Sequence, residues 1–294
     1  MSRSFLFVPA DSEKKLAKAK DSAADALIID LEDAVAPSAR PAARKIAAAF
    51  LAEGARQDLW VRINPLGSPD APEDMREVMP SAPAGIVLPK PHGACDVLEL
   101  AKRLDVLEQE HGLPAGQTKI LPIATERPAA LFHLHEYAES SARLAGLTWG
   151  AEDLSAAVGA TANRSSDGDW LAPYQFARSL CLFAAAAAEV PAIDTVYTDF
   201  RDHPGLARYA GLARRDGFAG MLAIHPAQVG IINEAFMPSA EEIRRAERII
   251  ALFAANPDAG TLALDGKMID RPHWLQARRI LEMVARMDKT SRPG

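Results

Sequence analysis

Two acidic residues, Glu126 and Asp153, follow consecutive apolar runs of the chain and are suited to holding a divalent cation. Glu126 ends the run at residues 119–126, and Asp153 follows Gly150 after the run that begins at Arg143. One or two carboxylates, together with water and substrate oxygens, are the usual ligands of Mg²⁺ in proteins. The pair therefore predicts a magnesium site, with Mn²⁺ as a substitute. The alternative is that each carboxylate caps the helix that follows it.

Two basic residues, Arg62 and Lys90, stand at the ends of two other apolar runs. Arg62 lies near the end of residues 59–64, and Lys90 lies between two prolines. A guanidinium can hold a carboxylate or stabilise an oxyanion, and a lysine can neutralise an acidic substrate. Both are therefore candidates for substrate binding, and Arg62 is also a candidate for catalysis. The alternatives are an ion pair of Arg62 with Asp30 or Glu32 and a structural salt bridge of Lys90.

Other polar residues at the ends of apolar runs are expected to support this site. Asp30, Glu32 and Asp33 follow one run and Asn64 follows the next, where they can orient Arg62 or metal-bound water. His225 ends the last run and is a candidate acid or base, but a histidine beside proline is also a common turn former. No cluster of histidines and cysteines suggests zinc.

Eight short apolar runs alternate with helix-like segments, and these are the elements that must position the polar residues. The runs cover residues 4–9, 26–30, 59–64, 84–90, 119–126, 143–149, 192–198 and 220–226. Continuous apolar runs are typical of parallel strands that are covered by helices. The pattern predicts a (β/α)₈ barrel, whose active site lies at the C-terminal ends of the strands. A doubly wound open sheet is the alternative, but no Gly-x-Gly-x-x-Gly motif follows the first run.

The chain continues beyond what eight units require, which predicts a barrel domain at residues 1–238 and an extension at residues 239–294. Ser239 and Glu242 have the spacing of a capping box, which favours a helix start. A final helix is expected over residues 272–287. The extension is either a lid on its own barrel or an arm that reaches a neighbouring subunit.

Composition favours a cytoplasmic enzyme. The 294 residues are 49% hydrophobic and 24% charged, and the net charge of −6 argues against nucleic acid or an anionic membrane as the main partner. Cys95 and Cys181 have no metal-ligand spacing and are too few for a disulfide framework, which fits a reducing compartment. Residues 1–10 do not have the pattern of a signal peptide, and no apolar segment approaches the roughly 20 residues that span a bilayer.

Over essentially its whole length the sequence resembles the citrate lyase beta-subunit-like branch of the HpcH/HpaI aldolase family. The resemblance rests on a set of short motifs that occur in one order. They are RSFLFVP (residues 3–9), DLEDAV (30–35), VRIN (61–64), LPK (88–90), TE (125–126), GAEDL (150–154), GFAG (217–220), IHPAQ (224–228) and DGKMID (265–270). Each motif alone is weak, whereas the ordered set is specific.

The resemblance implies a TIM barrel that binds Mg²⁺ through Glu126 and Asp153 and places Arg62 on a substrate oxygen. Such proteins make or break the carbon–carbon bond of 3-hydroxyacyl thioesters such as malyl-CoA, citramalyl-CoA or citryl-CoA, with a 2-oxo acid and an acyl-CoA as the other reactants. Where a helix starts, the backbone of Gly150 and Ala151, with Glu152 beside it, is expected to contact the carboxylate of the 2-oxo acid.

The resemblance also implies a homotrimer or homohexamer in which the extension docks on an adjacent subunit. Asp270 would then enter the neighbour's site as the acid or base. Coenzyme A is expected to contact basic residues near the start of the chain, for which Arg3, Lys14 and Lys18 are candidates.

Three other functions remain open from the sequence. The chain could be the beta subunit of a citrate lyase complex with partner subunits and an acyl-carrier thioester. It could be an aldolase that acts on free 2-oxo acids without coenzyme A. It could also be a non-catalytic regulator that binds a 2-oxo acid and a metal.

Overall fold

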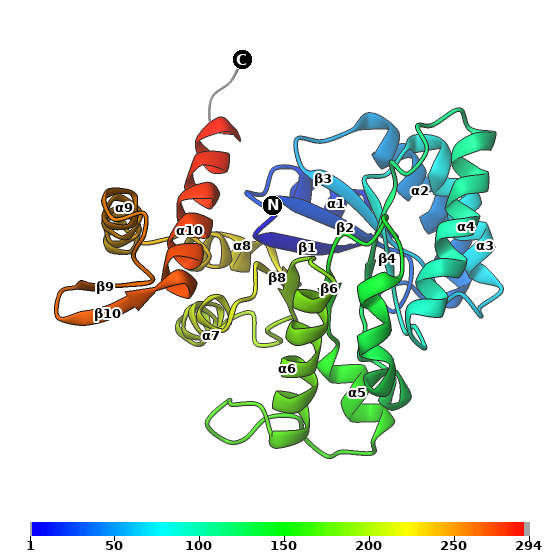
Figure 1. Ribbon diagram of the computed structural model, residues 1–294. Coiled ribbons are helices and arrows are strands. Elements are labelled where there is room, and N and C mark those ends of the chain that lie inside the picture. Colours follow the sequence, from blue (N-terminus) through cyan, green and yellow to red (C-terminus); the bar gives the residue numbers. More distant parts are fainter. Residues whose placement is uncertain (1, 291–294) are drawn as a thin grey trace. The chain divides into compact units, whose positions relative to one another are not determined.

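The chain forms a nearly closed barrel of eight parallel strands (Figure 1), seen in a computed structural model that describes residues 2–290, with side chains as far as residue 285. The strands are β1 (Ser4–Pro9), β2 (Ala26–Asp30), β3 (Asp58–Arg62), β4 (Gly85–Leu88), β5 (Lys119–Pro122), β6 (Leu147–Thr148), β7 (Ala192–Asp194) and β8 (Gly220–Ala223). They pair in the order β5-β4-β3-β2-β1-β8-β7-β6, and the parallel bridges Ile120–Leu144 and Ile123–Thr148 join β5 to β6. The predicted (β/α)₈ fold is confirmed, and each apolar run overlaps one strand.

Helical segments follow the strands and surround them (Figure 1). They are α1 (Glu13–Lys20), η1 (Pro37–Ala39), α2 (Arg40–Glu53), α3 (Asp70–Val78), η2 (Met79–Ser81), α4 (Ala94–Glu110), η3 (Pro128–Glu139), α5 (Ala151–Ala157), α6 (Ala172–Ala187), α7 (His203–Asp216) and α8 (Pro226–Ala235). The segment after β5 is a 3₁₀ helix over all of its 12 residues, although Pro128 begins it as expected. Within residues 2–290, no helix has the length and apolar character needed to cross a membrane.

Apolar side chains fill the inside of the barrel. Alternate residues of the strands point inward, and their cluster includes Phe5, Ile28, Trp60 and Leu121. Trp60 on β3 stands opposite Gly85 on β4, and a Cβ atom on that glycine would lie 2.2 Å from the indole ring. A larger apolar cluster lies between the strands and the helices. Because both faces of the strands are therefore apolar, the charged residues of the strands lie at the strand ends.

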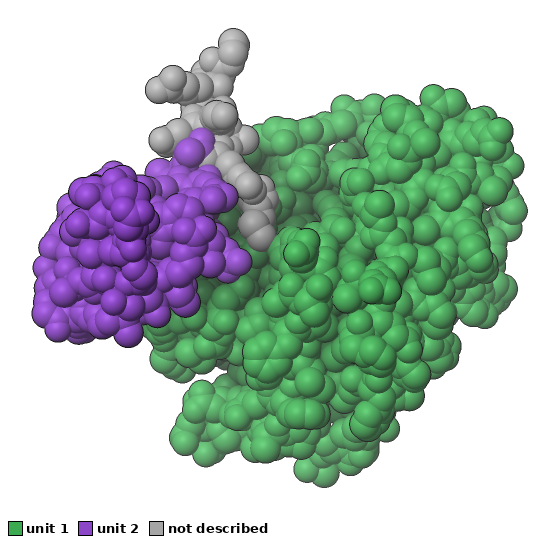
Figure 2. Space-filling model, viewed as in Figure 1, with its two compact units in different colours: residues 1–236 green, residues 237–294 purple. Residues whose placement is uncertain are grey.

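Residues 237–294 form a second compact unit, separate from the unit of residues 1–236 (Figure 2). Its elements are α9 (Ala240–Ala255), β9 (Thr261–Leu264), β10 (Lys267–Asp270) and α10 (Arg271–Thr290). Ser239 begins α9 with the predicted capping box, in which its hydroxyl accepts the Glu242 N–H at 3.2 Å. The two strands form an antiparallel hairpin whose two-residue turn, Asp265 and Gly266, has positive φ at both residues, as a type I′ turn requires.

The contact between Trp60 and Gly85 leads to a prediction on stability. Gly85→Ala is expected to lower the free energy of unfolding by about 1–3 kcal/mol, because the added methyl group overlaps an indole ring that is packed on all sides. The midpoint of urea unfolding measures this. Gly230→Ala in α8 is the matched control, since its added Cβ meets open space and should leave stability unchanged or slightly raised. Equal midpoints for wild type and Gly85→Ala would contradict the packing described here.

Candidate active site

Charged residues from five neighbouring strands meet at the C-terminal end of the barrel. The register pairs Asp30 of β2 with Arg62 of β3, so these two residues end adjacent strands side by side. A pocket of about 380 Å³ opens there. Among the predicted site residues, the pocket is lined by Asp30, Asp33, Arg62, Glu126, Gly150, Ala151, Glu152 and Asp153. The sequence motifs at the ends of β2, β3, β5 and β6 therefore come together in one cavity.

Arg62 is held by two carboxylates and one aromatic ring. Its Nε and Nη2 each donate to Asp30 at 2.7 Å, its Nη1 lies 3.0 Å from Glu32 Oε2, and its guanidinium lies 4.7 Å from the centre of the Phe7 ring. Burial lowers the pKa of Arg62, but the hydrogen bond and charge of Asp30, with Glu32, outweigh burial and raise it. Arg62 is thus a permanent cation in the pocket wall. The ion pair considered as its alternative role is present, and the residue still faces the cavity.

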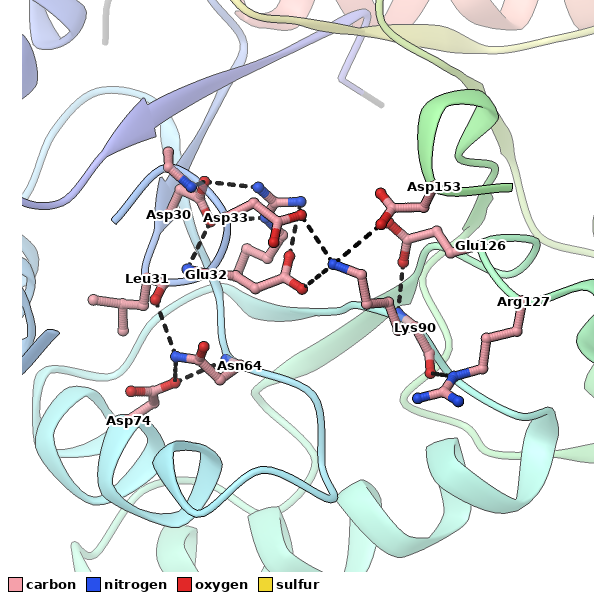
Figure 3. Close-up of polar contacts among 12 residues, drawn as sticks. Asp30, Leu31, Glu32, Asp33, Asn64, Asp74, Lys90, Glu126, Arg127 and Asp153 are labelled. Carbon is pink, nitrogen blue, oxygen red and sulfur yellow. Dashed lines mark hydrogen bonds and ion pairs between the residues drawn. The ribbon is translucent and has the colours of Figure 1, made fainter. Parts of the chain in front are cut away.

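Lys90 connects two sides of the same pocket (Figure 3). Its ammonium lies 2.5 Å from Glu32 Oε1, 2.9 Å from Asp33 Oδ2 and 3.3 Å from Asp153 Oδ1. Its backbone N–H donates to Glu126 Oε2 at 2.5 Å. Burial lowers the pKa of Lys90, but the hydrogen bonds with Glu32 and Asp33 and the surrounding negative charge outweigh burial and raise it. The structural salt bridge is therefore present.

Glu126 and Asp153 lie close to one another, with Lys90 beside them (Figure 3). The Glu126 side chain is buried, and burial followed by the charge of Asp153 holds its pKa well above the ordinary range. Gly150 permits this approach, because a Cβ atom there would lie 2.6 Å from Glu126 Cγ. Two adjacent carboxylates without enough positive charge beside them are a fitting environment for a divalent cation.

A metal at this position would have to take ligands from outside the chain as well. Within the described residues, no group of three or more histidine, cysteine, aspartate or glutamate side chains could hold a metal ion. Glu126 and Asp153 supply two hard oxygen donors, and Mg²⁺ commonly keeps several waters or substrate oxygens beside one or two carboxylates. The donor set thus fits Mg²⁺ and offers none of the sulfur or imidazole ligands typical of zinc.

Two of the supporting residues have defined structural contacts. Asn64 is buried, and its Nδ2 donates to Leu31 O at 3.0 Å and to Asp74 Oδ2 at 2.8 Å, which ties the ends of β2 and β3 together (Figure 3). His225 caps α8: its Nδ1 accepts the N–H of Ala227 at 3.2 Å. The turn-forming role considered for His225 is therefore the one that its contacts show.

The three residues expected to contact coenzyme A do not lie together in the pocket. Arg3 precedes β1, at the opposite end of the strands, and donates two hydrogen bonds of 2.8 Å to Asp25. Lys14 and Lys18 are exposed on α1, which follows β1. The structure thus does not bring Arg3 to the carboxylate cluster, and it leaves the two lysines on an outer helix.

Three residues that sequence reasoning missed contact the predicted site residues, and one of them, Phe7, also lines the pocket. Arg127 donates to Lys90 O at 2.7 Å, and Asp74 binds Asn64 from inside α3. Phe7 lies beneath the Arg62 guanidinium. A basic residue directly after Glu126, and an aspartate within a helix, are the signals that were available for the first two.

Comparisons with known proteins place these features in a family. The sequence model of the HpcH/HpaI aldolase/citrate lyase family matches residues 3–226. Citrate lyase subunit beta of Haemophilus influenzae is 34% identical over 284 residues, which are 95% of this chain and 96% of that protein. The mitochondrial citramalyl-CoA lyase of Rattus norvegicus is 30% identical over 296 residues, or 96% of this chain and 86% of that protein.

The fold has a solved counterpart of similar length. It is the protein CitE from Mycobacterium tuberculosis, crystallised in complex with magnesium, acetoacetate and coenzyme A. The TM-score is 0.79 and the sequence identity is 33%, and the match covers 96% of this chain and 98% of that one.

The ion pairs of Arg62 lead to a prediction on stability. Arg62→Met is expected to lower the free energy of unfolding by about 3–5 kcal/mol, because it leaves the buried carboxylate of Asp30 without its cationic partner and takes one of two cations from Glu32. Chemical denaturation measures the change. Arg76→Met is the control: its ion pair with Glu73 is exposed on both sides and should contribute less than about 1 kcal/mol. Similar losses for the two variants would contradict a buried network at the pocket.

Proposed function

The chain belongs to the HpcH/HpaI aldolase/citrate lyase family, and we propose that it is a Mg²⁺-dependent lyase for 3-hydroxyacyl-CoA thioesters. The relatives named above are carbon–carbon lyases, and the chain matches them over almost its full length. The observation that carries the proposal is the pocket in which Glu126 and Asp153 face Arg62. The products of cleavage would be a 2-oxo acid and an acyl-CoA, as from malyl-CoA, citramalyl-CoA or citryl-CoA.

The residues of the pocket suit this chemistry. Glu126 and Asp153 would hold the ion, which supplies a Lewis acid and a template for the oxygens of the 2-oxo acid when bound. Arg62 would donate hydrogen bonds to the oxygen that gains negative charge. In cleavage, a base takes the 3-hydroxyl proton, the bond between C2 and C3 breaks, and the thioester leaves as an enolate.

Asp270 is proposed as the acid or base, contributed by a neighbouring copy of the chain. It ends β10, and its Oδ1 lies 2.5 Å from Nδ1 of His273 in the first turn of α10. In the condensation direction, its carboxylate would take a proton from the methyl group of the thioester. A homotrimer or homohexamer would supply the neighbouring copy.

Coenzyme A is the proposed carrier of the acyl group. The similarity to a citramalyl-CoA lyase and to a structure with bound coenzyme A supports it. Lys14 and Lys18 remain candidates for the phosphates, whereas the ion pair of Arg3 with Asp25 occupies that residue elsewhere. The similarity to citrate lyase subunit beta keeps a second candidate function, a subunit that acts on an acyl-carrier thioester.

The metal pair is tested by replacing its carboxylates. Glu126→Gln and Asp153→Asn are each expected to lower kcat/KM for a cleaved acyl-CoA at least about 100-fold, because the ion contributes several kcal/mol to the transition state. Release of 2-oxo acid from malyl-CoA, citramalyl-CoA and citryl-CoA with Mg²⁺ is measured, and Glu139→Gln, on exposed η3, serves as the control.

The remaining functions are separated by adding an acyl-carrier thioester and free 4-hydroxy-2-oxo acids to these substrates. Turnover of an acyl-carrier thioester alone would favour the citrate lyase subunit. Cleavage of free 4-hydroxy-2-oxo acids would favour an aldolase that is independent of coenzyme A. If the wild-type protein cleaves none of these substrates and binds 2-oxo acid with Mg²⁺, the regulator is favoured and the lyase proposal is wrong.

The role of Asp270 is tested by complementation between two inactive variants. Glu126→Gln and Asp270→Asn should each be inactive alone, and co-expression should restore part of the cleavage rate if one copy supplies the barrel and another supplies Asp270. Co-expression of Glu126→Gln with Asp153→Asn is the control and should restore nothing, since both changes damage the same barrel. Absence of restored activity in the first mixture would refute a site shared between copies.

A further inference from the structure

Lys90 contacts both carboxylates of the proposed metal pair, and it does so with different ends of the residue. Its backbone N–H donates to Glu126 Oε2 at 2.5 Å, and its ammonium lies 3.3 Å from Asp153 Oδ1 (Figure 3). The other oxygens, Glu126 Oε1 and Asp153 Oδ2, accept no hydrogen bond from the described part of the chain. One oxygen of each carboxylate thus contacts Lys90, and one of each is left for another ligand.

The backbone of Lys90 adopts a conformation that is uncommon for this residue type. Its φ angle is +50°, in the left-handed region that residues other than glycine rarely occupy. Hydrogen bonds hold the residue on both sides, from its N–H to Glu126 and from Arg127 Nε to its carbonyl oxygen at 2.7 Å. Such a conformation persists where surrounding contacts enforce it, and it is commonly found at functional sites.

The ammonium of Lys90 is surrounded by protein carboxylates. Two of its three N–H groups donate hydrogen bonds to Glu32 and Asp33, and Asp153 forms an ion pair with it at 3.3 Å. Glu32 is itself fixed by Arg62 at 3.0 Å. Lys90 is therefore anchored at the end of β2 and reaches across to the first turn of α5.

We propose that Lys90 is a positioning residue that holds Glu126 and Asp153 at the separation a divalent cation needs. The inference rests on the proposed function, because it assigns the cation to this pair. Two adjacent carboxylates repel one another, and one of them is buried and cannot turn to solvent. Lys90 offsets that repulsion from the side away from the free oxygens, so that the pair stays together before the cation arrives.

A lysine that competed with the cation would have the opposite effect on cation affinity. If the ammonium simply competed with the cation for Asp153, its removal would strengthen cation binding, since one positive charge fewer would face the incoming ion. If Lys90 positions the pair, its removal weakens binding, as loss of groups that orient metal ligands commonly does. The direction of the change in affinity therefore decides between the two roles without any measurement of activity.

The experiment measures Mn²⁺ affinity by electron paramagnetic resonance and Mg²⁺ affinity by calorimetry. Lys90→Met is expected to weaken binding about 10–100-fold. Lys90→Gly retains the left-handed backbone and the N–H bond to Glu126 but removes the ammonium, and it should weaken binding to a similar extent. Lys102→Met, on the exposed face of α4, makes the same change of charge outside the pocket and should leave binding unchanged. Thermal unfolding of each variant establishes that the protein is folded.

The outcomes separate the two proposals. Unchanged or tighter binding by Lys90→Met and Lys90→Gly, in a protein whose binding is lost in Glu126→Gln, overturns the positioning role and leaves the metal pair intact. If the wild-type protein binds neither ion, the metal pair itself is wrong, and the positioning role is wrong with it.

Discussion

The mouth of the barrel depends on an imbalance of charge that is built into the ends of its strands. Five carboxylates meet there with two cationic side chains among them. They are Asp30, Glu32, Asp33, Glu126 and Asp153, with Arg62 and Lys90 as the cations. Because buried charges are costly without partners, this arrangement is tolerable only if each cation serves several acids. The acids outnumber the cations, and a divalent ion on Glu126 and Asp153, as proposed above, would offset the excess of negative charge.

The two cations differ in the number and arrangement of their N–H donors. A guanidinium has five N–H donors in one plane, and Asp30 and Glu32 contact each nitrogen of Arg62 only once. Each terminal nitrogen therefore has an N–H beyond the one that faces a carboxylate, on a side chain that lines the pocket. An ammonium has three donors, and two of those on Lys90 donate hydrogen bonds to Glu32 and Asp33, with Asp153 in ion-pair contact. The arginine thus has more donors left for a ligand than the lysine has.

Much of the fold could be predicted from the sequence, because parallel strands buried on both faces have a continuous apolar pattern. The apolar runs predicted all eight strands, and the spacing of Ser239 and Glu242 predicted the capping box of α9. It gave no sign that the segment after Pro128 is a 3₁₀ helix throughout. The apolar pattern does not indicate the hairpin of β9 and β10, although Asp265 and Gly266 are a typical turn pair.

The site was less predictable than the fold, because partners depend on tertiary structure. Strand ends identified which residues gather at the pocket, but not which pairs form there. Arg62 had two candidate partners in the sequence and contacts both. Lys90, for which the sequence left a substrate and a salt bridge as alternatives, contacts three acids. Nothing in the sequence indicates the left-handed backbone of Lys90, since a proline on each side does not determine that conformation.

The turn at Asp265 and Gly266 has a consequence for the direction in which Asp270 points. Side chains along a strand alternate between two faces, and the turn pairs Lys267 with Leu264 and Asp270 with Thr261. A shift of this pairing by one residue would point Asp270 to the opposite face of the hairpin. The two-residue turn, which fixes the pairing, therefore also fixes the face on which Asp270 lies.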